Sequence, residues 1–501
     1  MQHDQQTEKR LARLAGRLNI SSFSALVLGA LLSGCAFQTY TAKPLDLHTI
    51  ITEFREREPL DQGFQTFLLN QGYQPEQLPL TSWGLSEFTY SALYFHPDLD
   101  VARATWRASV AAEKTAGQRP NPGISVDTER HSETSGGISP WMLGLSIDIP
   151  LETGGKRQAR IDRATSLSQA ARIEIAQTAW QVRSRVHASW IDYQASVAQS
   201  RLLDQELALR GEIAEMIEAR LRAGMVSSHE SANARLLLLK TRQSLDTEKA
   251  MQVELRAKLA SSAGLSTDKL DGLKLIENDV LVDERRRSFI MDQQQQEKLQ
   301  ETALLNRLDI RAALARYDAA EAKLRLEVAR QYPDITLSPG YSYDQGDKIW
   351  SLSYATLLSL LNRNEGNIAE ADAQRELEAA RFKALQAAII GELDSRRAAY
   401  LQTLITLNDS RKLLDAQRER VQLSEKQFEQ GIADRLALTS ARLETLLAQQ
   451  GLIANEIRAQ RAAHALEEAM QHPLENPLAM PADLEQPALQ NQVISEPNHE
   501  S

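Results

Sequence analysis

The chain has 501 residues, of which 42% are hydrophobic, 5% aromatic and 25% charged, and its formal net charge is −10 at pH 7. This composition is too apolar for a disordered chain, poor in the aromatic residues that fill large cores, and too acidic to suit a nucleic-acid partner. The single cysteine, Cys35, excludes an internal disulfide bond and a thiolate metal cluster.

The N-terminus has the pattern of a secretory signal. Residues 1–19 carry four basic and two acidic side chains, and an apolar stretch centred on residues 25–32 follows them. That stretch is shorter than the ~20 residues that a membrane-spanning helix needs. We therefore expect residues 1–34 to be a signal peptide that is removed on export.

The end of this signal, Leu32-Ser33-Gly34-Cys35, resembles a bacterial lipobox. In a lipobox, cleavage leaves the cysteine as the first residue, and acyl chains are attached to it. Ala36 follows instead of the aspartate that resembles an inner-membrane retention signal, so we expect Cys35 to carry lipid and the chain to reach the outer membrane. The alternative is a chance cysteine in an ordinary signal or in an amphipathic helix.

The rest of the chain contains an internal duplication. The segment Asn121-Pro122-Gly123-Ile124 recurs 211 residues later as Tyr332-Pro333-Asp334-Ile335, and Leu221-Arg222-Ala223-Gly224 recurs 207 residues later as Phe428-Glu429-Gln430-Gly431. Similar offsets mean that both halves have the same parts in the same order. After the signal, we predict an N-terminal periplasmic segment (35–95) and a first repeat (96–264). An irregular equatorial belt (265–296), a second repeat (297–472) and a disordered tail (473–501) follow.

Each repeat contains two alternating segments that predict a β-hairpin, at residues 122–150 and 333–358. The clearest alternation sets large apolar side chains against small ones: Trp350, Leu352 and Tyr354 against Ser351, Ser353 and Ala355. Such alternation over about ten residues is typical of a transmembrane β-barrel. The alternative is a hairpin of a soluble β-sandwich that has one face exposed to solvent. Because four strands cannot close a barrel, membrane-spanning hairpins require the protein to oligomerise.

Long helices are predicted after each hairpin. Residues 152–223 and 366–430 contain no proline, and each segment would be about 100 Å long as one helix. In the second, apolar residues recur every seven positions at Leu393, Tyr400, Leu407 and Leu414. A shorter helix is expected before each hairpin, near residues 97–117 and 297–331.

Both long helices are expected to end at a glycine turn and to return as a second helix. Gly224 and Gly431 stand where a helix C-cap usually has glycine, and Ser228 or Asp434 can accept the first amide hydrogens of the returning helix. Each repeat is therefore a long helical hairpin with a β-hairpin at its far end.

No motif indicates an enzyme, a cofactor or a resident metal ion. The histidines are scattered without a His-Xaa3-His spacing, and there is no glycine-rich phosphate loop, nucleophile elbow or HExxH sequence. His229, beside the first glycine turn, is interpreted as a solvated turn residue. We expect no catalytic residues, no cofactor and no metal site.

Taken in order, the duplicated Pro-Xaa-Ile strand starts, the two glycine turns and the stretches 151–157 and 362–368 resemble the TolC-like outer membrane efflux proteins. These stretches, together with residues 92–99 (ALYFHPDL), are most similar to the heavy-metal, CzcC-like branch. The resemblance covers nearly all of the sequence after the signal.

The resemblance implies a mainly α fold with a small β part. It implies a lipid-anchored homotrimer, with a twelve-stranded outer-membrane β-barrel continued by a periplasmic α-helical barrel. The chain would be a passive exit duct for heavy-metal cations, linked through a periplasmic adaptor (membrane fusion) protein to an inner-membrane RND-type pump. Alternatives are a multidrug or type I secretion channel of the same fold, and a periplasmic coiled-coil adaptor or scaffold lipoprotein.

The resemblance also places the two turns at the periplasmic tip, where the adaptor docks, with Gly224, Ser228, Glu230, Gly431 and Asp434 as the site residues. Relatives often have aspartates six and nine residues after the second glycine, but here these positions are Ala437 and Ser440. We hypothesise that Glu230 and Asp434 form an acidic entrance instead. The alternative is that both carboxylates only favour the start of a helix.

Overall fold

The computed structural model describes residues 38–132, 136, 138–276, 301, 303–358 and 360–472. The chain divides into two compact units, residues 1–54 and 55–501. The predicted signal peptide, Cys35, most of the belt (277–296) and the tail (473–501) lie outside the described residues. In the first unit, the described residues contain the start of helix α2 (Leu47–Arg55).

The second unit is mainly helical with one small sheet, which confirms the predicted fold class. Its short elements before the first repeat are α3, α4 and a 3-10 turn η1: Gln62–Asn70, Leu85–Phe95 and Pro75–Gln77. The first repeat has α5, β1, β2, α6 and α7, followed by the 3-10 turn η2: Pro97–Ala116, Gly123–Arg130, Trp141–Leu151, Lys156–Arg222, Ser228–Ser262 and Thr267–Leu270. The second has α10, β3, β4, α11 and α12: Leu308–Ala329, Ile335–Asp344, Asp347–Thr356, Glu365–Glu429 and Arg435–Met470.

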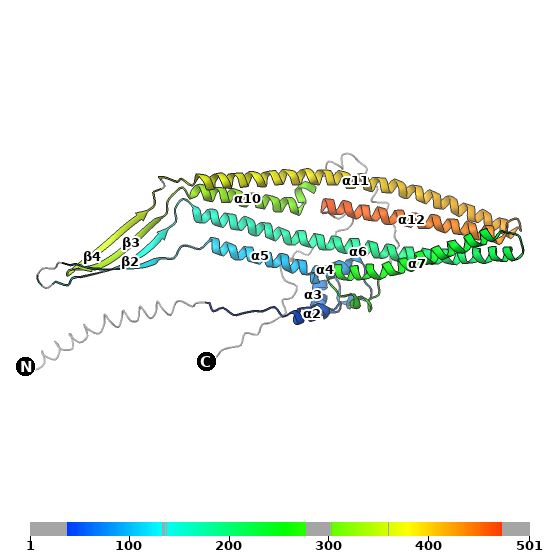
Figure 1. Cartoon of the computed structure of the whole chain (residues 1–501), viewed down its shortest axis with the longest axis horizontal. Coiled ribbons are helices and arrows are strands. Elements are labelled where there is room, and N and C mark those ends of the chain that lie inside the picture. Colours follow the sequence, from blue (N-terminus) through cyan, green and yellow to red (C-terminus); the bar gives the residue numbers. More distant parts are fainter. Residues whose placement is uncertain are drawn as a thin grey trace, which may run out of the picture. The chain divides into compact units, whose positions relative to one another are not determined.

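The long helices run beside one another within this unit. Helix α6 packs against α5, α7, α10 and α12, and α11 packs against α10 and α12. The strands lie at one end of these helices, and the α6–α7 and α11–α12 turns lie at the other (Figure 1). The seven-residue pattern in α11 forms part of the core, because Leu393, Tyr400, Leu407 and Leu414 are buried, and the first three belong to the cluster that includes Ala459 and Ala463 of α12.

The four strands form one antiparallel sheet in the order β1-β2-β3-β4. The β2–β3 pairing, in which Leu145 lies opposite Tyr341, joins the hairpins of the two repeats. Large apolar side chains are exposed along the strands, and Leu352 and Trp350 are 74% and 81% exposed. Asp148 accepts hydrogen bonds from Ser125 (2.6 Å) and Ser338 (2.5 Å), linking three strands. The sheet is therefore continuous, with β1 and β4 as its edges.

The short region before α5 forms an aromatic core that the sequence patterns did not predict. Three aromatic side chains are fully buried: Phe64 of α3, Phe88 of α4 and Trp83, which lies just before α4. The centroid of the Phe88 ring lies 5.7 Å from that of the Trp190 ring on α6. Trp83 also exchanges backbone hydrogen bonds of 2.8 Å with residues 274 and 276, which are the described end of the belt. This segment is thus packed onto the first repeat.

The helix expected at residues 297–331 is interrupted. Helical residues 301 and 303–306 are followed by Arg307, which is the N-cap of α10. The Arg307 guanidinium donates to the carbonyl of Ala469 and to Asp309, and the amide of Leu308 donates to Gln471 Oε1 at 2.8 Å. These hydrogen bonds to the end of α12 stabilise a new helix start at this point.

Residues of the stretch 151–157 in the first repeat form hydrogen bonds with Asp334, which directly precedes β3 of the second repeat. Asp334 accepts hydrogen bonds from the Lys156 ammonium (2.7 Å) and the Thr153 amide (3.0 Å). The adjacent Gly154 has a φ of +67°, and a Cβ built on it would lie 3.0 Å from the carbonyl oxygen of Ala329. The residues that carried the family resemblance here are therefore structural contacts between the repeats.

We expect Gly154→Ala to destabilise the fold by about 2 kcal/mol or more, because the alanine would combine left-handed backbone with a close contact. Gly155 offers a matched control, since its φ is +76° but a Cβ there meets nothing within 4 Å. Gly155→Ala should destabilise the fold by about 1 kcal/mol, the cost of placing an alanine in left-handed backbone without a close contact. Urea unfolding of both variants measures the difference, and equal losses would contradict the contact with Ala329.

Candidate functional site

The two glycine turns lie together at the end of the helices away from the sheet (Figure 1). Arg220, near the end of α6, forms an ion pair with Asp434, the residue before α12. Arg435, the first residue of α12, lies 3.5 Å from Glu212 of α6. These ion pairs join the turn of one repeat to the turn of the other.

The first turn closes through backbone hydrogen bonds. Gly224 has a φ of +71°, and the amides of Gly224 and Met225 each donate at 2.9 Å to carbonyls of α6. Left-handed backbone at this position is where glycine is favoured. The predicted glycine cap is therefore present.

The cap at the start of α7 differs from the prediction, because Ser227 takes the role expected of Ser228. The Ser227 hydroxyl accepts from the Glu230 amide at 3.3 Å, and the Glu230 carboxylate accepts from the Ser227 hydroxyl at 3.1 Å. Ser227 has the extended backbone of an N-cap, whereas Ser228 is already the first helical residue. Glu230 is thus part of a capping box.

The second turn has the same construction. Gly431 has a φ of +73°, and the amide of Ile432 donates to the carbonyl of Gln427 at 2.8 Å. As predicted, Asp434 is the N-cap of α12, accepting from the Ala437 amide at 2.8 Å. That hydrogen bond and, after it, the Arg220 guanidinium hold the pKa of Asp434 below its ordinary value. The ionised Asp434 carboxylate therefore stabilises the folded chain at pH values above its unfolded-state pKa. This stabilisation is lost as the pH falls through the lowered pKa of the folded chain.

Both turns expose one large apolar side chain directly after the glycine. Met225 is 68% exposed, and Ile432, its equivalent in the second repeat, is 73% exposed. We call Met225, Glu230, Ile432, Asp434 and the two turn glycines the tip surface. The glycines and carboxylates of this surface were predicted from the sequence, but the apolar pair was not. Aligning the two repeats at Gly224 and Gly431 places Met225 and Ile432 at equivalent positions and would have indicated the pair.

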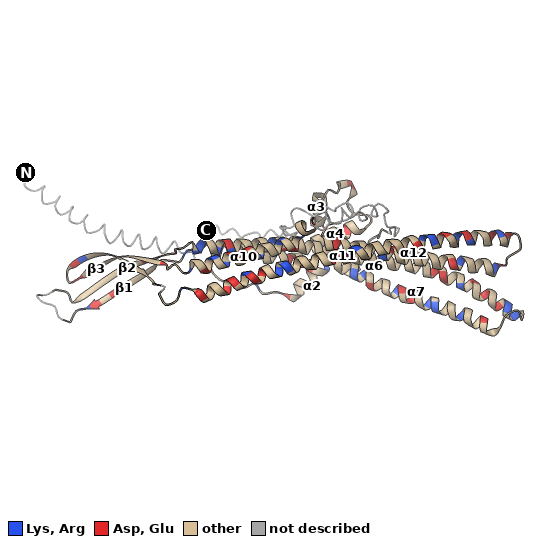
Figure 2. Cartoon of the chain, turned by 90° about the horizontal axis from the view of Figure 1, so that it is seen from above, with Lys and Arg blue, Asp and Glu red and all other residues tan. Residues whose placement is uncertain are grey.

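The helices leading to the tip surface are connected by exposed ion pairs. Arg235 and Glu218 lie 2.8 Å apart across the first hairpin, and Arg442 and Glu425 lie 2.9 Å apart across the second. Basic and acidic residues are interspersed along these ends of the helices (Figure 2). Since exposed pairs contribute only about 0–1 kcal/mol each, these ion pairs add little to the stability of this end of the helices.

The acidic-entrance hypothesis predicts that Glu230→Gln and Asp434→Asn lower the cation preference of channels in lipid bilayers. Both replacements remove a charge but keep a side chain that can cap a helix, so the turns should persist. Asp246→Asn, at an exposed acid farther along α7, is the control. An unchanged ion preference in the double variant would leave these carboxylates with a capping role alone.

Among the described residues, no helix has a segment that is both long and apolar enough to cross a membrane.

The profile of the family described as "Outer membrane efflux protein" matches residues 89–265 and 299–471. The chain is 26% identical over 273 residues to the cobalt-zinc-cadmium resistance protein CzcC of Cupriavidus metallidurans, a match that covers 51% of this chain and 58% of CzcC. The chain thus spans little more than half the length of that relative.

Three solved structures show the same fold at low identity. VceC from Vibrio cholerae has a TM-score of 0.62 at 20% identity, covering 78% of this chain and 97% of VceC. The outer-membrane channel OprN has a TM-score of 0.63 at 17% identity, with coverages of 88% and 99%. CusC has a TM-score of 0.59 at 16% identity, with coverages of 83% and 97%. With the family profile matched in both repeats, the chain belongs to the outer membrane efflux protein family, whose members are channels and not enzymes.

Proposed function

We propose that this chain forms, as a lipid-anchored homotrimer, the outer-membrane exit duct of a tripartite efflux system that exports heavy-metal cations. The observation that carries the proposal is the four-stranded sheet, which is open at both edges, exposes large apolar side chains and extends from one end of the long helices. A sheet of this kind is stable in lipid only when it is closed.

Trimer formation accounts for both edges of the sheet. The smallest membrane barrels have about eight strands, so one copy is too small to close. Three copies of a four-stranded sheet supply twelve strands, with β4 of one copy pairing with β1 of the next. The long helices would then surround a periplasmic tunnel below the barrel.

The tip surface is the proposed docking site for a periplasmic adaptor protein. Met225 and Ile432 are exposed at equivalent positions of the two repeats, so a trimer would present similar apolar contacts around the tip. The adaptor would connect this end to an inner-membrane pump of the RND type. Energy for transport would come from the pump, because the duct is passive.

The proposal of a metal substrate rests on the similarity to CzcC, a cobalt-zinc-cadmium resistance protein. Deletion of the chain from its host should lower tolerance to zinc, cobalt or cadmium, and expression of the wild-type chain should restore it. A Met225→Asp, Ile432→Asp double variant should reach the membrane without restoring tolerance, whereas Asp246→Asn should restore it. Sensitivity restricted to dyes and antibiotics would overturn the metal assignment, and extraction of the chain by carbonate would favour a periplasmic scaffold.

Lipid at Cys35 would help assembly without being the main anchor, because a closed barrel holds itself in the membrane. We expect Cys35→Ala to abolish incorporation of labelled fatty acid and to lower the yield of trimers, while channels still form. The variant should carry a signal peptide that does not depend on lipidation, so that export is preserved. Complete loss of trimers in exported protein would show that the lipid is essential.

A further inference from the structure

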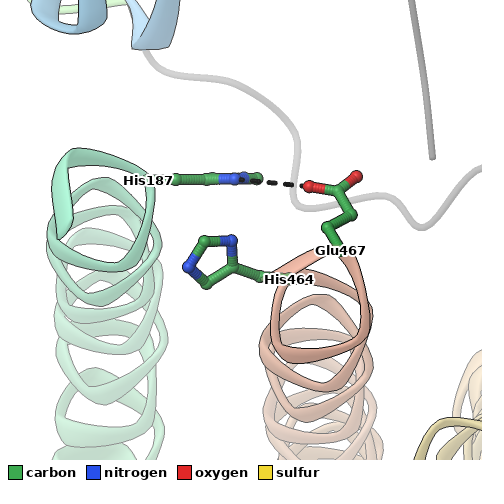
Figure 3. Close-up of side chains that lie close together, drawn as sticks. All are labelled: His187, His464 and Glu467. Carbon is green, nitrogen blue, oxygen red and sulfur yellow. Dashed lines mark ion pairs between the residues drawn. The ribbon is translucent and has the colours of Figure 1, made fainter. Parts of the chain in front are cut away.

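Three side chains with metal-ligating atoms come together between α6 and α12. His187 projects from α6, and His464 and Glu467 project from the facing side of α12 (Figure 3). One ligating atom of each residue lies within 4.8 Å of the other two, and His187 Nδ1 is 3.8 Å from Glu467 Oε2. The two imidazole rings have centroids 4.4 Å apart.

The helices bring these residues together and bury them. His464 and Glu467 are three residues apart on α12, so they lie on the same face of that helix, and α6 packs against α12. His464 and Glu467 are 8% and 4% exposed, and the His187 side chain is 19% exposed. The position of His187, 277 residues before His464, hid this cluster from a search for short-range motifs.

Ser184, one turn before His187 on α6, orients the ring of His464. Its hydroxyl lies 3.2 Å from His464 Nε2. With the proton on Nε2 and donated to Ser184, the lone pair of His464 is on Nδ1, which has no hydrogen-bond partner among the residues that the structure describes. A hydrogen bond from the second ring nitrogen to an oxygen is the usual support for a metal-binding histidine.

We propose that His187, His464 and Glu467 bind one divalent transition-metal cation, with Zn²⁺ as the best match. Two imidazoles and one carboxylate are a common Zn²⁺ ligand set, with a fourth position left for water. Tetrahedral ligands at ~2.0–2.1 Å from the metal are about 3.3 Å apart, so binding requires small side-chain rotations that draw the three groups together. The ion would be a resident link between α6 and α12, and this role does not depend on metal export by the channel.

One neighbouring charge opposes the cation. The guanidinium of buried Arg183 lies 4.9 Å from the centroid of the Trp180 ring and interacts electrostatically with Glu467 and His464. Glu468, the next residue of α12, contributes a negative charge near His464. Arg183 therefore offsets part of the negative charge of Glu467, and the two imidazole nitrogens favour a transition metal over Mg²⁺ or Ca²⁺.

To test the proposal, the purified full chain is first freed of metal with a chelator. One sample is then titrated with Zn²⁺ and a second sample with Co²⁺. We expect one ion per chain, a melting temperature that rises with Zn²⁺ concentration, and the visible absorption of four-coordinate Co²⁺. Ser184→Ala should weaken Zn²⁺ binding by about 10- to 100-fold, and His464→Gln and Glu467→Gln, which each remove a ligand, should weaken it more than Ser184→Ala does. The control is His229→Gln, at an exposed histidine of the tip, which should bind as the wild type does.

If the buried variants do not fold, His187→Gln at the more exposed position and the Co²⁺ spectrum of the wild type still decide the matter. Binding that is unaffected by His187→Gln, or a wild-type chain with no Zn²⁺-dependent rise in melting temperature, would overturn the site. In that case the three residues form an ion-paired helix contact, and His187→Gln should lower stability equally with and without Zn²⁺. Growth on metals, which tests the proposed efflux function, is read independently of these titrations.

Discussion

Leu352→Arg should prevent the chain from assembling in the outer membrane, whereas Ser353→Arg should leave assembly largely intact. Leu352 belongs to the apolar face of β4, and it is 74% exposed in the single chain. In the proposed barrel this face meets lipid, where arginine near the bilayer midplane costs about 2–4 kcal/mol. The cost recurs in every copy of a trimer, so the population of assembled channel should fall steeply.

Ser353 is the matched control because it is the next residue of the same strand and points to the opposite face. It lies opposite Ser338, whose hydroxyl donates to Asp148, so this face of the sheet is polar. Assembled trimers in membrane fractions can be counted by gels run without heating. Equal assembly of both arginine variants would mean that the apolar face does not contact lipid.

Phe88→Ala should lower the free energy of unfolding by about 3–5 kcal/mol, the range for a fully buried phenylalanine. The Phe88 ring lies 5.2 Å from the ring of Trp83 and 5.7 Å from that of Trp190, so its loss leaves a cavity between α4 and α6. The same substitution at Phe428, which is 41% exposed near the tip surface, should cost far less. Denaturant unfolding of the detergent-solubilised protein measures both. Similar losses at Phe88 and Phe428 would show that residues 62–95 are not packed as the structure has them.

The elements with strong local signals could be predicted from the sequence. Alternation located the hairpins, the absence of proline located α6 and α11, and Gly224 and Gly431 located the turns, because each of these signals reflects backbone geometry within a few residues. The seven-residue pattern through Tyr400 also gave the buried face of α11. The predicted N-cap of α7 was wrong by one residue, because Ser227 and Ser228 are adjacent serines and either could cap the helix as judged from the sequence.

Features that depend on contacts between distant residues could not be predicted in this way. The β2–β3 pairing joins strands of different repeats, and the helix interruption at Arg307 depends on Ala469 and Gln471 at the end of α12. The pairing of Trp83 with Leu275 could not be predicted either, because no periodic sequence pattern marks these two residues. For the tip surface, the sequence placed the carboxylates at the turns and predicted the Asp434 cap. The capping box of Ser227 with Glu230 and the ion pair of Asp434 with Arg220 required the structure.

The position of the two sheet edges also bears on the order of events during biogenesis. Each edge strand presents backbone N–H and C=O groups that lipid cannot satisfy, at several kcal/mol per group. If the chain forms the proposed duct, a single copy would be a poor substrate for insertion, and copies would have to meet before or while they enter the bilayer. The rate of insertion would then rise steeply with the concentration of exported chains in the periplasm.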